Sequence, residues 1–333
     1  MKTIFFIIGL VIFVFLTNEF GIENIVINIQ KTGWWLLPII GVWFIVYLMN
    51  ALAWWFVLKS QRKKVSFLEI FSISLSGFAI NYITPVVNLG GEPYKIIALK
   101  EKLGIHKAVS SVLLYSMLHF LSSFVFWIMV ILLMFLTIPL SFDLQIILGA
   151  GFIAAVLGVL FFYSRHKNGI INSLIKIISK LPFTTKLITK IKLEEDSLIT
   201  IDNQIVDFYG NNKFDFYISL MFEVAARFVA SIEFIFILRA IGINISFQEA
   251  LYINAFSSFV MNIFFFVPLE LGVREGSLYF IMNILKFSSG IGIYIGLVNR
   301  IREFFWIFIG LLLIQLRKTN LPNKEVINYA DIK

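Results

Sequence analysis

Apolar side chains fill stretches of about 20 residues along nearly the whole chain, with few charged positions inside them. These stretches are apolar on every helical face, which indicates lipid rather than water as their surroundings. The pattern predicts six full transmembrane helices, at about 3–20, 34–58, 106–137, 144–163, 214–240 and 289–316. Proline and glycine interrupt two further segments, about 66–100 and 246–286, which gives eight apolar segments in all.

Composition agrees with an all-α integral membrane protein. Hydrophobic residues make up 59% of the 333 residues and charged residues 14%, against about 25% in ordinary soluble domains. We therefore expect a single polytopic membrane domain over 1–320 and a cytoplasmic tail over 321–333, without a soluble domain. There are no cysteines and only three scattered histidines. Neither a metal site nor any other cofactor is therefore expected.

Lysine and arginine gather between the apolar segments, so the net charge of +8 indicates positive-inside loops rather than nucleic-acid binding. The basic loops follow about 58, 100, 163 and 316, which predicts a plasma-membrane protein with both termini in the cytoplasm. Both flanks of 66–100 are basic, so this segment should enter and return as a re-entrant hairpin. Segment 246–286 should do the same from the outside.

The connector at about 164–213 has isoleucines and leucines at helical spacing with lysines between them. This pattern fits a basic amphipathic helix lying on the anionic leaflet. It fits equally well a connector packed against the helix bundle.

The two interrupted segments share a motif, which predicts an internal repeat. Both open on Ser-Phe-x-Glu, at 66–69 and 246–249, and a glutamate follows each later proline by seven positions. The matched residues are Asn81, Pro85 and Glu92 in the first copy and Asn262, Pro268 and Glu275 in the second. Three full spans separate the copies, so units 34–137 and 214–316 should have opposite topology. Inverted repeats with interrupted helices are typical of transporters.

Charged side chains inside apolar segments are costly and usually face a partner or a cavity. Guanidinium and ammonium groups suit phosphate, which favours an anionic lipid headgroup as the ligand. The predicted headgroup and transport residues are Asn81, Glu92, Lys95, Asn262, Arg274, Glu275 and Arg300. The predicted hairpin turns contain Pro85, Gly90, Gly91, Pro268 and Gly272. Candidates for a proton site or an ion pair are His119, Glu223, Arg227, Arg302 and Glu303.

Each candidate also has a purely structural interpretation. Glu223 and Arg227 are four residues apart, which favours an ion pair along one helix. His119 is expected more often as a hydrogen-bonded interior residue than as a proton carrier. Glu92 and Glu275 either titrate in a transport path or hold the neighbouring cations in place.

The turns and part of the last span carry a resemblance to a known family. The motifs are Asn-Tyr-Ile-Thr-Pro with Leu-Gly-Gly-Glu-Pro within 81–93, Val-Pro with Leu-Gly-Val-Arg-Glu-Gly within 267–276, and Asn-Arg-Ile-Arg at 299–302. Over about 5–316 the chain resembles the lysylphosphatidylglycerol synthase transmembrane-region family, also called flippase-like. The resemblance implies translocation of an anionic or aminoacylated phospholipid or of a polyprenyl-linked lipid.

Full-length synthases of that family carry a soluble domain that transfers lysine from lysyl-tRNA to phosphatidylglycerol. Only a short tail follows Leu316, so we expect a flippase-like protein rather than that enzyme. Two alternatives stay open: a membrane-embedded lipid transferase using Glu92 and His119, and a noncatalytic subunit of a lipid or glycan pathway. The expected partners are membrane lipids, anionic ones above all, together with a second copy of the chain or a lipid-synthesis enzyme.

Overall fold

The computed structural model describes residues 15, 18, 22–58, 61, 63–83, 90–165 and 195–319. Within these ranges every regular element is a helix and no strand occurs, which confirms the all-α prediction. Four predicted features lie largely outside the described residues: the first span, the turn with Pro85, the basic part of the connector and the tail.

Five long helices lie where the pattern predicts full spans. They are α3 (Leu36–Val57), α6 (Ile105–Thr137), α7 (Phe142–Arg165), α11 (Lys213–Ala240) and α14 (Gly290–Thr319). Each interrupted segment forms two shorter helices: α4 (Phe67–Ile83) and α5 (Gly91–Leu103) in the first, α12 (Phe247–Ile263) and α13 (Val273–Ile284) in the second. The remaining elements are α2 (Ile22–Thr32), η1 (Gly33–Trp35), α10 (Glu195–Asn211) and η3 (Pro268–Glu270).

The chain is a multi-pass membrane protein. Among the described residues, three stretches are both long and apolar enough to cross a bilayer: Gln30–Val57, Ile105–Thr137 and Phe142–Ser164. The helices α11, with 28 residues, and α14, with 30, also have the required length, but each contains several charged side chains. The division into six crossing helices and two re-entrant hairpins stays a prediction.

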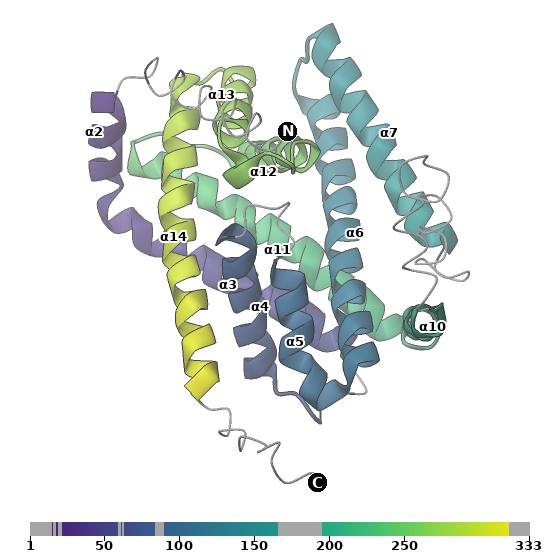
Figure 1. Cartoon of the computed structure of the whole chain (residues 1–333). Helices are drawn as coiled ribbons and strands as arrows, with labels where there is room; N and C mark the ends of the chain where they lie inside the picture. The colour runs from purple at the N-terminus through teal and green to yellow at the C-terminus, as the bar shows by residue number, and fades with distance from the viewer. Residues whose placement is uncertain are drawn as a thin grey trace, which may run out of the picture.

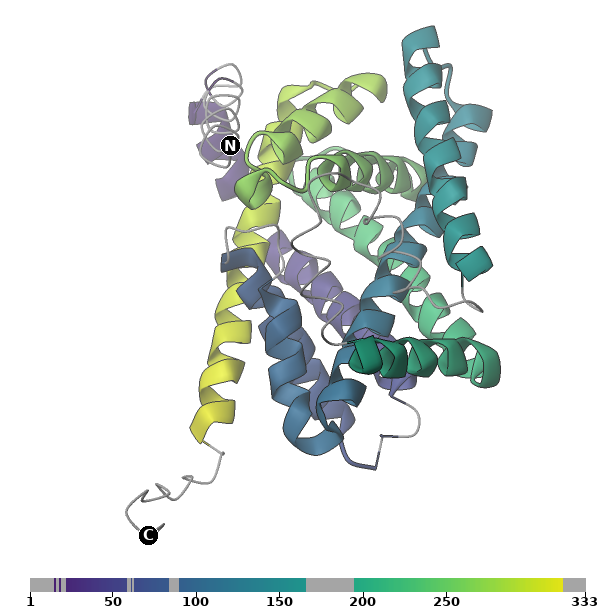
Figure 2. The same cartoon turned by 45° about the vertical axis from the view of Figure 1, so that its right-hand side comes forward.

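The helices α3 and α11 lie side by side and run diagonally through the centre of the bundle, with α14 on one side and α6 and α7 on the other (Figure 1). The α4–α5 pair lies toward one end of the bundle and the α12–α13 pair toward the opposite end, in both views (Figures 1 and 2). The two interrupted segments therefore approach the middle from opposite directions.

Contacts between helices recur in the two halves. In the first half α3 packs on α4, α4 on α5 and α5 on α6; in the second, α11 packs on α12, α12 on α13 and α13 on α14. Across the halves, α4 contacts α14 just as α12 contacts α6. Each hairpin thus rests on the long final helix of the other half.

Two glycines bring helix backbones into direct contact, one within the first hairpin and one where the second hairpin meets α14. A Cβ atom at Gly91, the first residue of α5, would lie 2.2 Å from the carbonyl oxygen of Gly77 in α4. A Cβ atom at Gly292, near the start of α14, would lie 2.3 Å from the backbone nitrogen of Tyr279 in α13. Small residues permit such close packing of helices in membranes, where packing and hydrogen bonds rather than water drive association.

The described part of the connector packs against the bundle. Ile201, Ile205 and Phe208 of α10 are buried, and Ser110 of α6 donates a hydrogen bond of 2.5 Å to Gln204. Burial raises the pKa of the Tyr209 hydroxyl well above its ordinary value. In Figure 2, α10 lies across the end of the bundle that holds α4 and α5. This segment therefore fits the packed-connector interpretation, while the lysine-rich segment lies outside the described residues.

Candidate functional site

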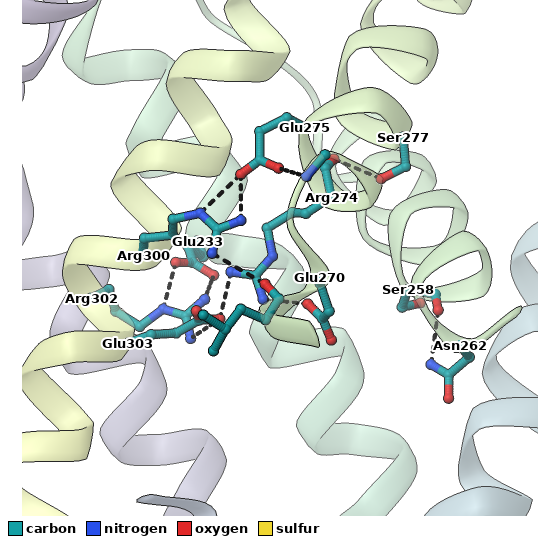
Figure 3. Close-up of polar contacts among 12 residues, drawn as sticks. Glu233, Ser258, Asn262, Glu270, Arg274, Glu275, Ser277, Arg300, Arg302 and Glu303 are labelled. Atoms are coloured by element: carbon teal, nitrogen blue, oxygen red, sulfur yellow. Dashed lines mark hydrogen bonds and ion pairs between the residues drawn. The ribbon is translucent and has the colours of Figure 1, made fainter. Parts of the chain in front are cut away.

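Seven charged side chains meet where η3 and α13 approach α11 and α14 (Figure 3). We call this set the arginine–glutamate cluster. Its members are Glu233, Glu270, Arg274, Glu275, Arg300, Arg302 and Glu303. All lie on helices or at a helical turn, so the backbone fixes their positions before any ligand binds.

At the inner end of the cluster, Arg302 of α14 is paired with Glu233 of α11. Its Nε and Nη2 atoms lie 3.0 and 3.3 Å from the two carboxylate oxygens, and both side chains are almost fully buried. Trp43 of α3 donates its indole N–H to Glu233 at 2.6 Å, and the guanidinium lies 3.8 Å from the Trp43 ring. Arg302 thus combines a bidentate ion pair with a cation–π contact.

Arg274 of α13 bridges the turn and the last helix. Its Nη2 lies 2.5 Å from Glu270 in η3, and its Nη1 lies 2.7 Å from Glu303 in α14. Glu303 in turn lies 3.6 Å from Arg302. The buried carboxylate of Glu303 therefore joins two arginines from different helices.

Arg300 of α14 holds the start of α13. Two of its nitrogens lie 2.9 and 2.7 Å from the same Glu275 oxygen, and a third donates to the Leu269 carbonyl at 3.2 Å. The other Glu275 oxygen accepts a hydrogen bond of 3.0 Å from the backbone N–H of Gly272. Glu275, which is fully buried, therefore caps α13 and anchors Arg300 at once.

The turn beneath these arginines has an unusual backbone. Leu269 and Glu270 have φ values of 56° and 53°, and Gly272 has 74°. Left-handed conformations are uncommon for residues other than glycine and cost about 1–3 kcal/mol each. Arg300 bonds the carbonyl of Leu269 and Arg274 bonds the carboxylate of Glu270, so the two arginines hold this turn in place.

Apolar side chains form the outer edge of the turn. Phe264, Phe265 and Phe266 are exposed by 43%, 54% and 36%, and Leu269 by 40%. Phe304, one residue beyond Glu303, is exposed by 60%. The cluster is thus separated from the surroundings by side chains that suit acyl chains rather than water.

A second polar group lies at the matching turn of the first half. Lys95 of α5 is almost fully buried, with its Nζ 2.8 Å from Glu92 and 5.7 and 5.2 Å from the ring centres of Trp54 and Tyr115. Ser116 of α6 donates to the other Glu92 oxygen at 3.1 Å. Glu92 therefore contacts α6 through Ser116, much as Glu275 contacts α14 through Arg300.

A third polar group joins α6 to α11. The Nδ1 atom of His119 lies 2.8 Å from a carboxylate oxygen of Glu223. Arg227 donates to the hydroxyl of Ser122 at 2.9 Å and to the His119 carbonyl at 2.8 Å. Glu223 and Arg227 each bond the neighbouring helix, and their charges also act on each other along α11.

A family model described as the lysylphosphatidylglycerol synthase TM region matches residues 3–310. The chain belongs to this family. Comparisons with curated proteins and with solved structures gave no match. In this lysylphosphatidylglycerol synthase TM-region protein, the matched range contains both interrupted helices and every charged residue of the arginine–glutamate cluster.

The structure of this family member brings together only part of the predicted headgroup set. Arg274, Glu275 and Arg300 meet in one cluster, which also contains the predicted pair residues Arg302 and Glu303. Glu92 and Lys95 pair with each other in the first half.

The two asparagines have local roles. Asn81 accepts a hydrogen bond of 2.6 Å from the backbone N–H of Gly91, which ties α4 to the start of α5 next to Gly90. Asn262 donates to the Ser258 carbonyl one turn earlier at 2.8 Å and lies away from the cluster (Figure 3). Of the predicted turn residues in the second half, Pro268 begins η3 and Gly272 precedes α13 with a positive φ.

Two members of the arginine–glutamate cluster, Glu233 and Glu270, are missing from the predicted set, as is Trp43, which donates a hydrogen bond to Glu233. Glu233 interrupts the apolar run 228–238, and a charge within such a run is itself a usable signal. Trp43 carries no comparable signal, because tryptophan is common in apolar spans and near membrane interfaces. Its role depends on the packing of α3 against α11, which brings it beside Glu233.

The cluster contains three arginines and four glutamates, so it has one carboxylate in excess. Arg274 and Arg300 both contact carboxylates in this arrangement, so a phosphate that binds them competes with Glu270, Glu303 or Glu275. Among the described residues, no group of histidine and carboxylate side chains is arranged to hold a metal ion.

Proposed function

We propose that this protein moves an anionic lipid between the leaflets of the bilayer, as a flippase-like member of its family. The observation that carries the proposal is the cluster of buried arginines at an interrupted helix. Charged groups at membrane depth usually mark a substrate or ion path. Guanidinium groups match the geometry of phosphate oxygens better than an ammonium group does.

Arg274 and Arg300 can contact either the turn at Leu269 and Glu270 or a lipid phosphate. In the present arrangement Arg274 contacts Glu270 and Glu303, while Arg300 contacts Glu275 and Leu269. A lipid phosphate that draws these guanidinium groups away also removes the contacts that hold the left-handed turn. Headgroup binding and rearrangement of the turn are thereby linked.

The matching contacts of the two halves support an inverted repeat as the source of alternating access. Each hairpin packs on the final helix of the other half, and the hairpins approach from opposite ends of the bundle. In transporters built this way, one repeat moves relative to the other around a central site. Exposed phenylalanines next to the cluster provide a lateral path for acyl chains while the headgroup crosses.

The test uses proteoliposomes with fluorescent phosphatidylglycerol, whose movement is followed by quenching from outside. We expect movement well above that in protein-free vesicles, and a loss of at least about tenfold in the double variant Arg274→Ala with Glu92→Gln. Arg239→Ala is the matched control, because Arg239 is an exposed arginine in the last turn of α11.

Two results separate the site from the function. If the double variant folds and moves lipid at the unmodified rate, the site assignment is wrong. If the unmodified protein moves neither phosphatidylglycerol nor an aminoacylated or polyprenyl-linked phospholipid, the function is wrong. Phosphatidylcholine in parallel vesicles tests the requirement for a net negative headgroup.

A further inference from the structure

The His119–Glu223 pair is a titratable pair that the proposed lipid path does not use. His119 lies near the middle of the 33-residue helix α6, within an apolar run. Its side chain is 46% exposed, whereas that of Glu223 is 1% exposed. A histidine in this position is in contact with the surroundings and with a buried carboxylate at the same time.

The Glu223 carboxylate is buried near the Tyr115 hydroxyl and the Arg227 guanidinium. One of its oxygens contacts His119 Nδ1 at 2.8 Å. Burying a charged carboxylate costs free energy unless it is paired and hydrogen-bonded. A proton on the carboxylate, or on the imidazole beside it, reduces this cost.

The charged and titratable groups around His119 come from three helices. They are Tyr115 on α6 itself, Glu92 and Lys95 on α5, and Glu223 and Arg227 on α11. Of the other helices packed on α6, α3 has no charged residue, and α7 and α12 carry theirs in the first or last turn. The last, α10, contacts α6 near its start, through Ser110.

Two side chains connect the pair to the first hairpin. The Tyr115 ring lies 6.4 Å from the His119 ring, and Lys95 Nζ lies 5.2 Å from the Tyr115 ring. Ser116, next along α6, donates to Glu92. A change of charge at His119 can therefore affect the Glu92–Lys95 pair through Tyr115 and Ser116.

We propose that His119 and Glu223 form a proton-binding site, and that one proton is bound there for each anionic lipid that is moved. The second half of this statement rests on the proposed function; the first half does not. With neutral His119, the charges of Glu92, Lys95, Glu223 and Arg227 cancel. One added proton gives this group a charge of +1, and one proton that crosses with one headgroup of charge −1 moves no net charge across the hydrocarbon core.

The proton site is tested without any transport measurement. In the variant His106→Gln with His166→Gln, His119 is the only histidine left, and ¹⁵N-histidine spectra in nanodiscs report its protonation directly. At one fixed pH, replacing phosphatidylcholine by phosphatidylglycerol should raise the imidazolium fraction of His119. Glu223→Gln in the same background should abolish the rise.

A second single-histidine protein supplies the control for the acidic membrane surface. His106 is exposed in the first turn of α6, and the variant His119→Gln with His166→Gln leaves it as the only reporter. An anionic surface at about −30 mV raises the local proton concentration roughly threefold for any exposed group. If His119 responds no more than His106, or if Glu223→Gln leaves its response unchanged, the proton site is overturned.

Coupling is tested in proteoliposomes with a pH difference of about one unit across the membrane. One proton per lipid should drive fluorescent phosphatidylglycerol to a leaflet ratio of about tenfold in the unmodified protein and in His106→Gln. His119→Gln should lose this response. Lipid movement that ignores the gradient overturns the coupling while leaving the proposed function intact. If no lipid moves at all, the proposed function fails and the spectra alone decide the proton site.

Discussion

Replacing Arg302 by methionine tests whether the buried ion pairs stabilise the fold as their geometry implies. Methionine keeps most of the side-chain volume and removes the charge. Glu233, 1% exposed, is then left with the Trp43 N–H at 2.6 Å and without the two guanidinium bonds. An uncompensated carboxylate at this depth is the main consequence of the change.

The expected loss follows from that buried charge. Removing one member of a buried ion pair costs about 3–5 kcal/mol of unfolding free energy. The lost contact with the Trp43 ring adds up to about 2 kcal/mol. Hydrogen bonds between membrane helices average only about 0.6 kcal/mol each. The ring contact and the two hydrogen bonds together account for about 3 kcal/mol, so a loss above about 4 kcal/mol reports the stranded charge.

The measurement is unfolding in mixed micelles with an increasing fraction of denaturing detergent, followed by tryptophan fluorescence. Seven tryptophans provide the signal. Combining Arg302→Met with Glu233→Gln removes the stranded charge, so the double variant should regain at least about 2 kcal/mol relative to the single one. Arg239→Met, at an exposed position, should change stability by less than about 0.5 kcal/mol.

Equal losses in the single and double variants would refute this reasoning, because the cost would then lie in packing rather than in charge. A single-variant loss below about 1 kcal/mol would also refute it. That result would mean that water or lipid headgroups reach Glu233 in the membrane.

Three further substitutions test other parts of the fold in the same unfolding measurement. Gly91→Ala should cost at least about 1–3 kcal/mol of unfolding free energy, because the new methyl group meets the Gly77 carbonyl oxygen at 2.2 Å. Its control is Gly149→Ala, where nothing lies within 4 Å of the new methyl group. This control should be neutral or stabilising by up to about 1 kcal/mol. Ser246→Ala should cost about 1 kcal/mol, because it removes the capping box of α12. Glu69→Gln should cost less than about 1 kcal/mol and lose its effect in high salt, since its bonds to basic side chains lie at the exposed end of the bundle.

The positions of the helices could be predicted from the sequence because apolar runs end where polar loops begin. The structure places α11 at 213–240 and α14 at 290–319, against predictions of 214–240 and 289–316. The breaks in the two hairpins could be predicted from proline and glycine. Gly272, for example, has a positive φ and lies where the pattern predicts a turn.

Side-chain partners were much harder to predict from the sequence, because they depend on how helices that are far apart in the sequence pack together. Spacing along α11 favoured a bond between Glu223 and Arg227, yet Glu223 contacts His119, which is 104 residues away. Glu233 is paired with Arg302 across 69 residues. Local sequence shows that a buried charge needs a partner, but only the packing of α3, α11 and α14 decides which one.

The pairing of Glu233 with Arg302 also has a consequence for biogenesis. Because Arg302 follows Glu233 by 69 residues, we expect α11 to enter the membrane before its main counter-charge has been synthesised. A charged side chain at the centre of an inserting helix costs about 2.5–3.5 kcal/mol. Trp43, on the earlier helix α3, is by then available to bond the carboxylate. We therefore expect α3 and α11 to pack together before α14 joins them. A chain truncated before α14 should leave Glu233 with its Trp43 bond but without its arginine partner.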